Sequence, residues 1–156
     1  MDKNNFLELR FPPPVVFLAF AGLMWLMSVY VPWATVALPA KMPFALAIAA
    51  VGGLFAGTSI GSFLRARTTL HPDKPMKTTT LVVTGVYSIT RNPMYLSLLF
   101  VLVGWAIYLA NVVAALLIPL FVSYLNCFQI KPEERVLASL FGKEFEAYSK
   151  RVRRWL

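Results

Sequence analysis

Polar side chains that could bind charged groups flank one long apolar stretch of the sequence. Arg91 and Tyr95 stand where this stretch begins, and the pair Glu133 and Glu134 follows its end. The planar guanidinium group of arginine can bind a carboxylate or a phosphate, and a carboxylate can bind an ammonium group or hydroxyls. Tyr95 comes one helical turn after Arg91, so both side chains would lie on one helix face. These residues are the first candidates for a binding site.

The same residues also have purely structural explanations. Arg91 could be a membrane anchor whose charged end reaches the lipid headgroups. Asn92 could cap a helix that starts at Pro93, since proline suits the first helical turn. Glu133 and Glu134 could open another helix, where acidic residues complement the positive end of the helix dipole. The residue types alone leave both interpretations open.

Composition shows what kind of protein must position these residues. The chain has 156 residues, of which 58% are hydrophobic and 14% charged, and its mean hydropathy is +0.66. Ordinary soluble domains carry roughly a quarter charged residues. A disordered chain, a nucleic-acid-binding arm and most soluble enzymes are therefore excluded. A membrane-spanning helix needs about 20 mainly apolar residues, so the chain can supply roughly four.

The charge-free intervals of the sequence locate these spans. The longest interval, 95–130, exceeds one span, and Ala110 and Asn111 near its middle predict a very tight turn. Pro119 should bend the helix that follows, because proline removes a backbone donor and crowds the preceding turn. We predict an all-α, polytopic membrane protein forming a single domain over 1–156. Its four expected spans are about 13–31, 43–64, 94–110 and 112–130.

Small residues recur at every fourth position of the second expected span. The ladder comprises Ala45, Ala49, Gly53, Gly57 and Gly61. Within a membrane, such a stripe lets another helix approach closely. We expect it to pack inside the four-helix bundle rather than to form a homodimer interface, although a monomer and a weak homodimer both stay open.

The basic residues predict the orientation. Lys41 alone of the 15 Lys and Arg residues falls in a connection on one side of the membrane. The positive-inside rule therefore places both termini and the 65–93 loop in the cytoplasm. The start of the chain lacks the pattern of a cleavable signal, so we expect the first span to be retained. We expect a bacterial or archaeal cell membrane rather than an organelle.

Two cytoplasmic segments remain outside the spans. In the 65–93 loop, Leu81 to Val83 should be extended, and the lone His71 is interpreted as a polar loop residue rather than a general base. The tail 131–156 has apolar residues at helical spacing and should form an amphipathic helix on the membrane surface, with a bend at Gly142. The net charge of +8 thus reports topology, and no nucleic acid is implied.

Ordered motifs in the second half of the chain resemble one enzyme group. Gly85, Tyr87 and the run Arg91-Asn92-Pro93-x-Tyr95 are followed by a helical hairpin, Glu133-Glu134 and FGKEFEAYSKRVRR. This order resembles the isoprenylcysteine carboxyl methyltransferase and phospholipid methyltransferase group of integral-membrane enzymes, over about 65–156. Asn92 stands where many relatives have histidine. A Gly-x-Gly pair of phospholipid methyltransferases is missing, which favours the isoprenylcysteine-type branch.

The resemblance implies S-adenosylmethionine as methyl donor at the cytoplasmic face. It also implies a lipophilic acceptor from the membrane, an isoprenylcysteine-type carboxylate or a related lipid. By resemblance Arg91 and Glu134 are the catalytic candidates, with no metal. The implied cofactor-binding set is Gly85, Tyr87, Asn92, Pro93, Tyr95, Glu133, Glu134, Tyr148 and Arg151.

Two other function classes stay open at this point. Sterol-reductase-like membrane enzymes that use NADPH have a similar C-terminal segment, although they are much longer. A non-catalytic helical module or lipid-binding scaffold would also fit the glycine ladder and the basic tail. An ion pump is disfavoured, because the four expected spans carry no ionisable Asp, Glu, Lys, Arg or His.

Overall fold

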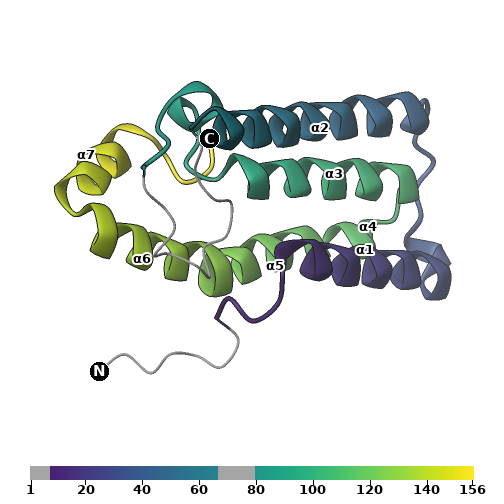
Figure 1. The fold of residues 1–156 in the computed structure, drawn as a ribbon. Coiled ribbons are helices and arrows are strands. Elements are labelled where there is room, and N and C mark those ends of the chain that lie inside the picture. Colours follow the sequence, from purple (N-terminus) through teal and green to yellow (C-terminus); the bar gives the residue numbers. More distant parts are fainter. Residues whose placement is uncertain (1–7, 67–79) are drawn as a thin grey trace.

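The computed structural model describes residues 8–66 and 80–156, and His71 lies outside them. Within this part of the chain the regular structure is helical, with one isolated bridge between Thr35 and Asn111. Figure 1 shows the order of the elements. They are α1 (Pro13–Tyr30), η1 (Pro32–Ala34), α2 (Lys41–Ala66), η3 (Gly85–Ser88), α3 (Pro93–Leu109), α4 (Val112–Ala115), α5 (Leu117–Leu125), the π-helix η4 (Asn126–Ile130), α6 (Lys131–Phe141) and α7 (Lys143–Arg151).

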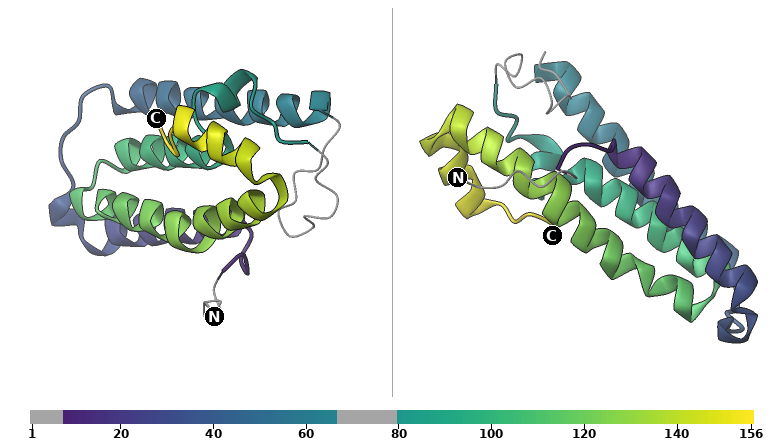
Figure 2. Two further views of the ribbon diagram at one scale, coloured as in Figure 1. Left: turned by 90° about the vertical axis from the view of Figure 1, so that its left-hand side faces the viewer. Right: turned by 90° about the horizontal axis from the view of Figure 1, so that it is seen from below.

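Long apolar helical runs lie side by side and form the body of the molecule (Figures 1 and 2). Three of them are long and apolar enough to cross a membrane: Pro13–Tyr30, Lys41–Arg65 and Val112–Phe141. The fourth, Pro93–Leu109, has 17 residues and covers about 26 Å at 1.5 Å per residue, close to one hydrocarbon core. The protein is a multi-pass, all-α membrane protein, as the sequence predicted.

The turn between α3 and α4 is as tight as predicted. Ala110 adopts a left-handed conformation with φ of 52°, and the Asn111 side chain accepts a hydrogen bond from the Ala114 backbone N–H. The Asn111 amide also donates to the Val31 carbonyl at 2.9 Å and to the Thr35 hydroxyl at 3.2 Å. One side chain therefore closes this turn and fixes it to the connection after α1.

The fourth helical run is interrupted near Pro119, where we predicted a bend. The helix breaks at Leu116, between α4 and α5, three residues before the proline. Pro119 has no N–H to donate to the Ala115 carbonyl, and its ring crowds that turn. The two segments nevertheless continue in the same general direction (Figure 1).

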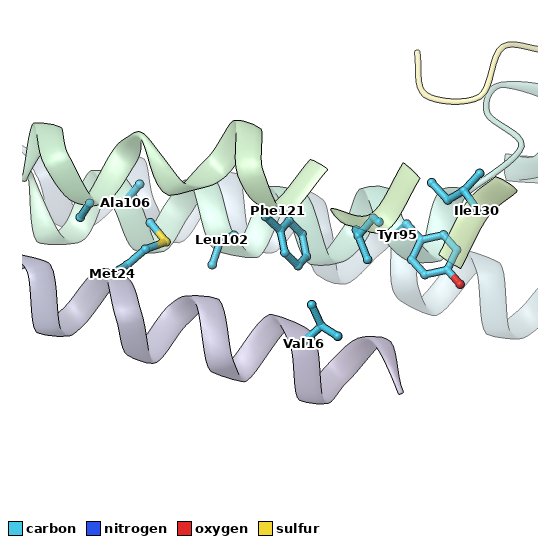
Figure 3. Close-up of a cluster of buried hydrophobic side chains, with 9 residues drawn as sticks. Val16, Met24, Tyr95, Leu102, Ala106, Phe121 and Ile130 are labelled. Atoms are coloured by element: carbon cyan, nitrogen blue, oxygen red, sulfur yellow. The ribbon is translucent and has the colours of Figure 1, made fainter. Parts of the chain in front are cut away.

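The apolar core lies between α1, α3 and the run α5–η4. Met24, Leu102, Phe121, Leu125 and Ile130 are completely buried there. Figure 3 shows Tyr95 beside Ile130 at one end of this core. Large apolar side chains also cover the outer helix faces, as lipid-facing surfaces require.

The closest contact between α2 and α3 uses two glycines. A Cβ on Gly104 would lie 2.7 Å from the Ala45 carbonyl oxygen, and a Cβ on Gly52 would lie 2.8 Å from the Ser97 carbonyl oxygen. Ala45 and Ala49 of the predicted ladder do pack inside the bundle. Gly53, Gly57 and Gly61, however, would have nothing within 4 Å of an added Cβ. The expectation that the whole ladder packs inside the bundle was therefore wrong for these three glycines.

Pro132 does not open a new helix, contrary to expectation. Backbone angles at Ile130 and Lys131 are helical, and α6 continues directly from η4. The missing N–H of Pro132 leaves the Phe128 carbonyl without its intrahelical partner, and the Leu9 N–H donates to that oxygen at 3.0 Å. The N-terminal segment thus compensates for a proline inside the helix. Glu133 and Glu134 therefore do not sit at a free helix end, and the dipole explanation for them is lost.

The tail bends at Gly142, as predicted, and forms two helices rather than one. Gly142 has φ of 47°, a left-handed value that suits glycine, and α7 turns back toward the bundle (Figure 1). On α7, Phe145 and Tyr148 are buried in a small cluster with Leu81. The apolar face of α7 therefore packs on protein. This turn brings the end of the chain to the start of α3.

Candidate functional site

The segment after α7 is hydrogen-bonded to the residues that precede α3. The Arg91 N–H donates to the Arg153 carbonyl at 3.0 Å. The Thr90 hydroxyl and the Asn92 side-chain amide both donate to the Arg154 carbonyl, at 3.1 and 3.0 Å. Pro93 is the first residue of α3 as expected, but Asn92 does not cap the helix with its side chain. Its amide holds the C-terminal segment instead.

Glu134 forms ion pairs with two arginines. Arg154 binds it through both ends of its fork, with Nη2 at 2.6 Å from Oε2 and Nε at 3.2 Å from Oε1. Arg91 Nη2 lies 3.2 Å from Oε1 of the same carboxylate. The Glu134 side chain is only 17% exposed, so solvent screens these charges weakly. Two cations facing one anion leave this cluster with an excess positive charge.

Arg91 keeps one unused donor within the cluster. Its Nε is buried and has no hydrogen-bond partner among the residues that the structure describes. An unsatisfied buried donor costs roughly 1–3 kcal/mol, so such atoms are uncommon in folded proteins. The atom belongs to a cationic group, and an anionic oxygen would satisfy it best. The site is therefore suited to a ligand that carries a carboxylate or a phosphate.

Glu133, beside Glu134 on α6, accepts a hydrogen bond from the Tyr95 hydroxyl. It lies one turn beyond Ile130, where the apolar part of the run ends. Burial raises the pKa of Glu133 to about 7, although the Tyr95 hydroxyl lowers it, and the neighbouring Glu134 charge raises it further. The carboxyl can therefore hold or release a proton near neutral pH.

Two tyrosines form the opposite wall of the site. The Tyr148 hydroxyl on α7 donates to the Tyr87 carbonyl on η3 at 2.7 Å. Burial raises the pKa of Tyr148 to about 12, with the Arg91 charge acting in the opposite direction. Burial also raises the pKa of Tyr87, while the nearby Ser59 hydroxyl lowers it. Both tyrosines therefore stay protonated at neutral pH, and the Tyr148 hydroxyl serves as a hydrogen-bond donor.

Gly85 supplies the turn that presents Tyr87. Its φ of 64° is left-handed, and an added Cβ would also come within 3.3 Å of the Ser62 hydroxyl on α2. The Tyr87 ring then meets Phe63 of α2 edge to face, with ring centroids 5.4 Å apart. This turn therefore packs η3 against the end of α2.

The structure brings most of the predicted site residues together at one end of the bundle. Arg91, Glu134, Tyr95 and Glu133 form the connected cluster, with Asn92, Tyr87 and Tyr148 around it. Arg151 is exposed on α7, and Arg154 makes the ion pair with Glu134.

Sequence reasoning missed Arg154, Thr90 and the contact between the Trp155 indole and Asn126, at 3.2 Å. No spacing signal could have found them, because Val152 is extended and ends the helical repeat.

An open groove lies beside this cluster, between α2 and η3. Its volume is about 560 Å³. Its lining is mostly apolar, with one charged residue at the end of α2. The lining residues are Leu54, Phe55, Gly57, Thr58, Gly61, Ser62, Arg65, Gly85, Val86 and Ile89.

Comparison with known proteins gives independent information on this region. The family model for phospholipid methyltransferases matches residues 40–144, about two thirds of the chain. A protein-S-isoprenylcysteine O-methyltransferase of Schizosaccharomyces pombe is 35% identical over 72 residues, which cover 46% of this chain and 30% of that enzyme.

An uncharacterized protein of Haemophilus influenzae is 48% identical over 63 residues, which cover 40% of this chain and all of that protein. No solved structure matches the chain significantly. The family match includes α3 and α6, which contribute Tyr95, Glu133 and Glu134 to the cluster, and the η3–α3 connection, which contributes Arg91. The chain therefore belongs to the phospholipid methyltransferase family of membrane proteins.

Proposed function

We propose that this protein transfers a methyl group from S-adenosylmethionine to a lipophilic acceptor at the cytoplasmic end of its helix bundle. The observation that carries the proposal is the cluster of Arg91, Arg154 and Glu134 beside Tyr95 and Glu133. It lies at the ends of apolar helices, where a water-soluble cofactor and a membrane-soluble acceptor can meet. The Schizosaccharomyces pombe relative, a protein-S-isoprenylcysteine O-methyltransferase, supports the same proposal.

The residues present fit the cofactor. S-adenosylmethionine carries a carboxylate, an ammonium group, ribose hydroxyls and a sulfonium. The unpartnered Arg91 Nε suits the carboxylate, and Glu133 or Glu134 suits the ammonium group or the hydroxyls. When bound, the cofactor would supply an electrophilic methyl group.

The chain's own residues would position the cofactor and the acceptor and shield both from water. A displacement in line with the sulfur depends on alignment, and fixed geometry supplies much of such a rate gain. Arg91 precedes α3, Tyr95 stands in its first turn, and Glu133 and Glu134 lie on α6. A hydrogen bond from Tyr95 to Glu133 and an ion pair between Arg91 and Glu134 join these segments. Partial burial of the cluster strengthens its electrostatic contacts.

The acceptor atom decides whether a base is needed. A carboxylate acceptor of the isoprenylcysteine type is already anionic and needs none. An amine, thiol or phenol must lose a proton, and Glu133, with its pKa raised by burial to about 7, would be the group to accept it. Asn92 has no basic nitrogen, so it would bind and position only. We favour the carboxylate, because the cluster carries excess positive charge.

Calorimetry with S-adenosylhomocysteine on the detergent-purified protein tests the proposal. We expect binding by the wild type and clear loss in Arg91→Lys and Glu134→Gln. Glu146→Gln is the matched control, since Glu146 is exposed and pairs only with Lys150 on α7. A folded protein that binds no S-adenosylhomocysteine would overturn the proposal. Binding of NADPH instead would point to a reductase, and a stable protein partner without cofactor affinity would point to a scaffold.

Incubation with labelled S-adenosylmethionine then tests the acceptor. A prenylated cysteine with a free carboxylate should become labelled, whereas its methyl ester should not. Labelling of a lipid amine in place of the carboxylate would contradict the isoprenylcysteine-type assignment but not the methyl transfer itself.

A further inference from the structure

The groove between α2 and η3 belongs to none of the interactions described for the polar cluster. It extends from Leu54 to Arg65, which is twelve residues of α2 or about 16 Å along the helix. This part of α2 lies within the apolar run Lys41–Arg65, so the groove faces the membrane over most of its length. Its volume of about 560 Å³ is in the range of small-molecule sites.

Glycine forms the floor of the groove. Gly57 and Gly61 lie one turn apart, and a Cβ added to either would meet nothing within 4 Å. Leu54 beside them is 69% exposed and forms a raised edge. The helix backbone is therefore bare along a strip that a flexible chain could touch directly.

The second wall of the groove decides what can occupy it. Val86 and Ile89 of the η3 region stand opposite the glycines, and Ile89 is 57% exposed. A second helix with its side chains is about 10–12 Å across, and this wall would keep it away from Gly61. A single hydrocarbon chain is much narrower and can enter. The shape therefore favours a lipid chain over a second copy of α2.

Charge and position indicate the polar end of the occupant. Arg65 is the charged residue of the lining, and it stands at the end of α2 nearest to the site. Ile89 precedes Arg91 by two residues, so their backbones are at most about 7 Å apart. The same η3 turn carries Tyr87 in the polar cluster and Val86 in the groove. The groove and the candidate active site thus share one element.

We propose that this groove binds the hydrocarbon chain of an anionic, single-chain amphiphile, with its charged end at Arg65. The inference rests on the proposed function, because this amphiphile would be the methyl acceptor. The glycine floor provides close contact with the chain, and Arg65 recognises its anionic end. The groove then determines which acceptors can place their polar end at the cluster.

Photolabelling tests the location of the chain. The full-length protein in phosphatidylcholine nanodiscs is irradiated with a long-chain fatty acid that carries a diazirine on its chain, and labelled peptides are identified by mass spectrometry. We expect label on 54–65 and 85–89. The corresponding long-chain alcohol should compete at least about tenfold less well than the unlabelled acid, because it lacks the charge. Label confined to other helix faces would overturn the proposal.

Two substitutions on the groove floor test its role. Gly57→Leu and Gly61→Leu should fill the groove without disturbing the protein, and labelling should fall by about tenfold. Gly53→Leu is the matched control, since Gly53 is equally open but lies outside the groove lining, and labelling should not change. Equal labelling in all three variants would contradict the proposal. Loss of a crosslinked dimer in Gly57→Leu would also contradict it, because the groove would then be occupied by a second copy of the protein.

Parallel calorimetry with S-adenosylhomocysteine separates this inference from the proposed function. Gly57→Leu should keep its affinity for S-adenosylhomocysteine and raise the KM for the acceptor. Labelled groove peptides in a protein without S-adenosylhomocysteine affinity would uphold the lipid site and overturn the methyl transfer. Affinity for S-adenosylhomocysteine without labelling of the groove peptides would uphold the methyl transfer and overturn the lipid site.

Discussion

Glu134 is the residue on which the charges of the site converge. It receives a forked contact from Arg154 and a second contact from Arg91, and all three side chains are at least partly buried. Removing the carboxylate would leave two guanidinium groups near each other without a counter-charge. The site therefore depends more on Glu134 than on either arginine.

Glu134→Gln should lower the free energy of unfolding by about 1–3 kcal/mol, because buried charged groups lose their partner. Thermal unfolding in detergent would measure this as a lower Tm than that of the wild type. Glu146→Gln, in an exposed pair, should change stability by at most about 0.5 kcal/mol. Equal Tm values for the two variants would show that the Glu134 pairs contribute nothing to the fold.

Glu133 should make stability depend on pH. Burial raises its pKa from 4.5 to about 7, so between these values the folded state binds more protons than the unfolded state. Stability contributed by this group is therefore full below pH 4.5, falls as pH rises, and is constant above pH 7.

Comparison with Glu133→Gln isolates this effect, because the amide cannot ionise but can still accept from Tyr95. The Tm of the wild type relative to this variant should fall between pH 4.5 and 7. A Tm difference that does not vary with pH would contradict the raised pKa.

At the residue scale, local spacing predicted contacts within helices but not contacts across the turn at Gly142. Arg91 and Tyr95 were expected on one helix face, but Arg91 lies two residues before α3, and the Asn92 backbone between them is not helical. Arg154 could not be assigned, because its position depends on the direction in which α7 returns and on the extended Val152. Arg151, which the family resemblance implied, is exposed.

At the scale of elements, the contact between α2 and α3 positions η3 and the start of α3. Their backbones approach so closely that Gly52 and Gly104 have no room for a side chain. The sequence showed a ladder of small residues but not which of them face the partner helix. The ladder has a packed part, Ala45 and Ala49, and an open part, Gly53, Gly57 and Gly61, at the same spacing. Only the packed structure distinguishes the two parts.

Gly104→Ala should destabilise the protein clearly, by about 1–3 kcal/mol, because the new Cβ would lie 2.7 Å from the Ala45 carbonyl oxygen and force the helices apart. Gly53→Ala should be neutral or stabilising by up to about 1 kcal/mol, because alanine is the better helix former and the site is open. Unfolding of both variants in the same detergent would compare them. A similar loss in both would contradict the packing described here.

At the scale of the whole molecule, the site lies at one end of the bundle and Lys41 at the other. Lys41 stands at the start of α2, with its ammonium group 5.6 Å from the centre of the Tyr108 ring. The other basic residues within 8–66 and 80–156 lie at the opposite end of the spans or beyond it. Composition predicted this polarity because it depends only on counting charges between apolar runs.

A topology experiment tests the proposed orientation. A cytoplasm-active reporter fused after the C-terminal segment should be active, whereas a reporter inserted near Leu38, in the α1–α2 connection, should be inactive. An exported-phosphatase reporter at the same two positions should give the opposite pattern. Inverted results would place the candidate site on the outer face of the membrane.

The hydrogen bonds between the N-terminal segment and η4 also bear on how the chain is made. The Leu9 N–H donates to the Phe128 carbonyl, which lacks its usual partner because Pro132 has no N–H. The Gln129 side chain donates to the Phe11 carbonyl, 118 residues away in the sequence. At roughly 5–20 residues per second, a ribosome needs about 6–24 s to cover that separation. The segment of Leu9 and Phe11 therefore cannot form these hydrogen bonds until the last spanning helix has been synthesised.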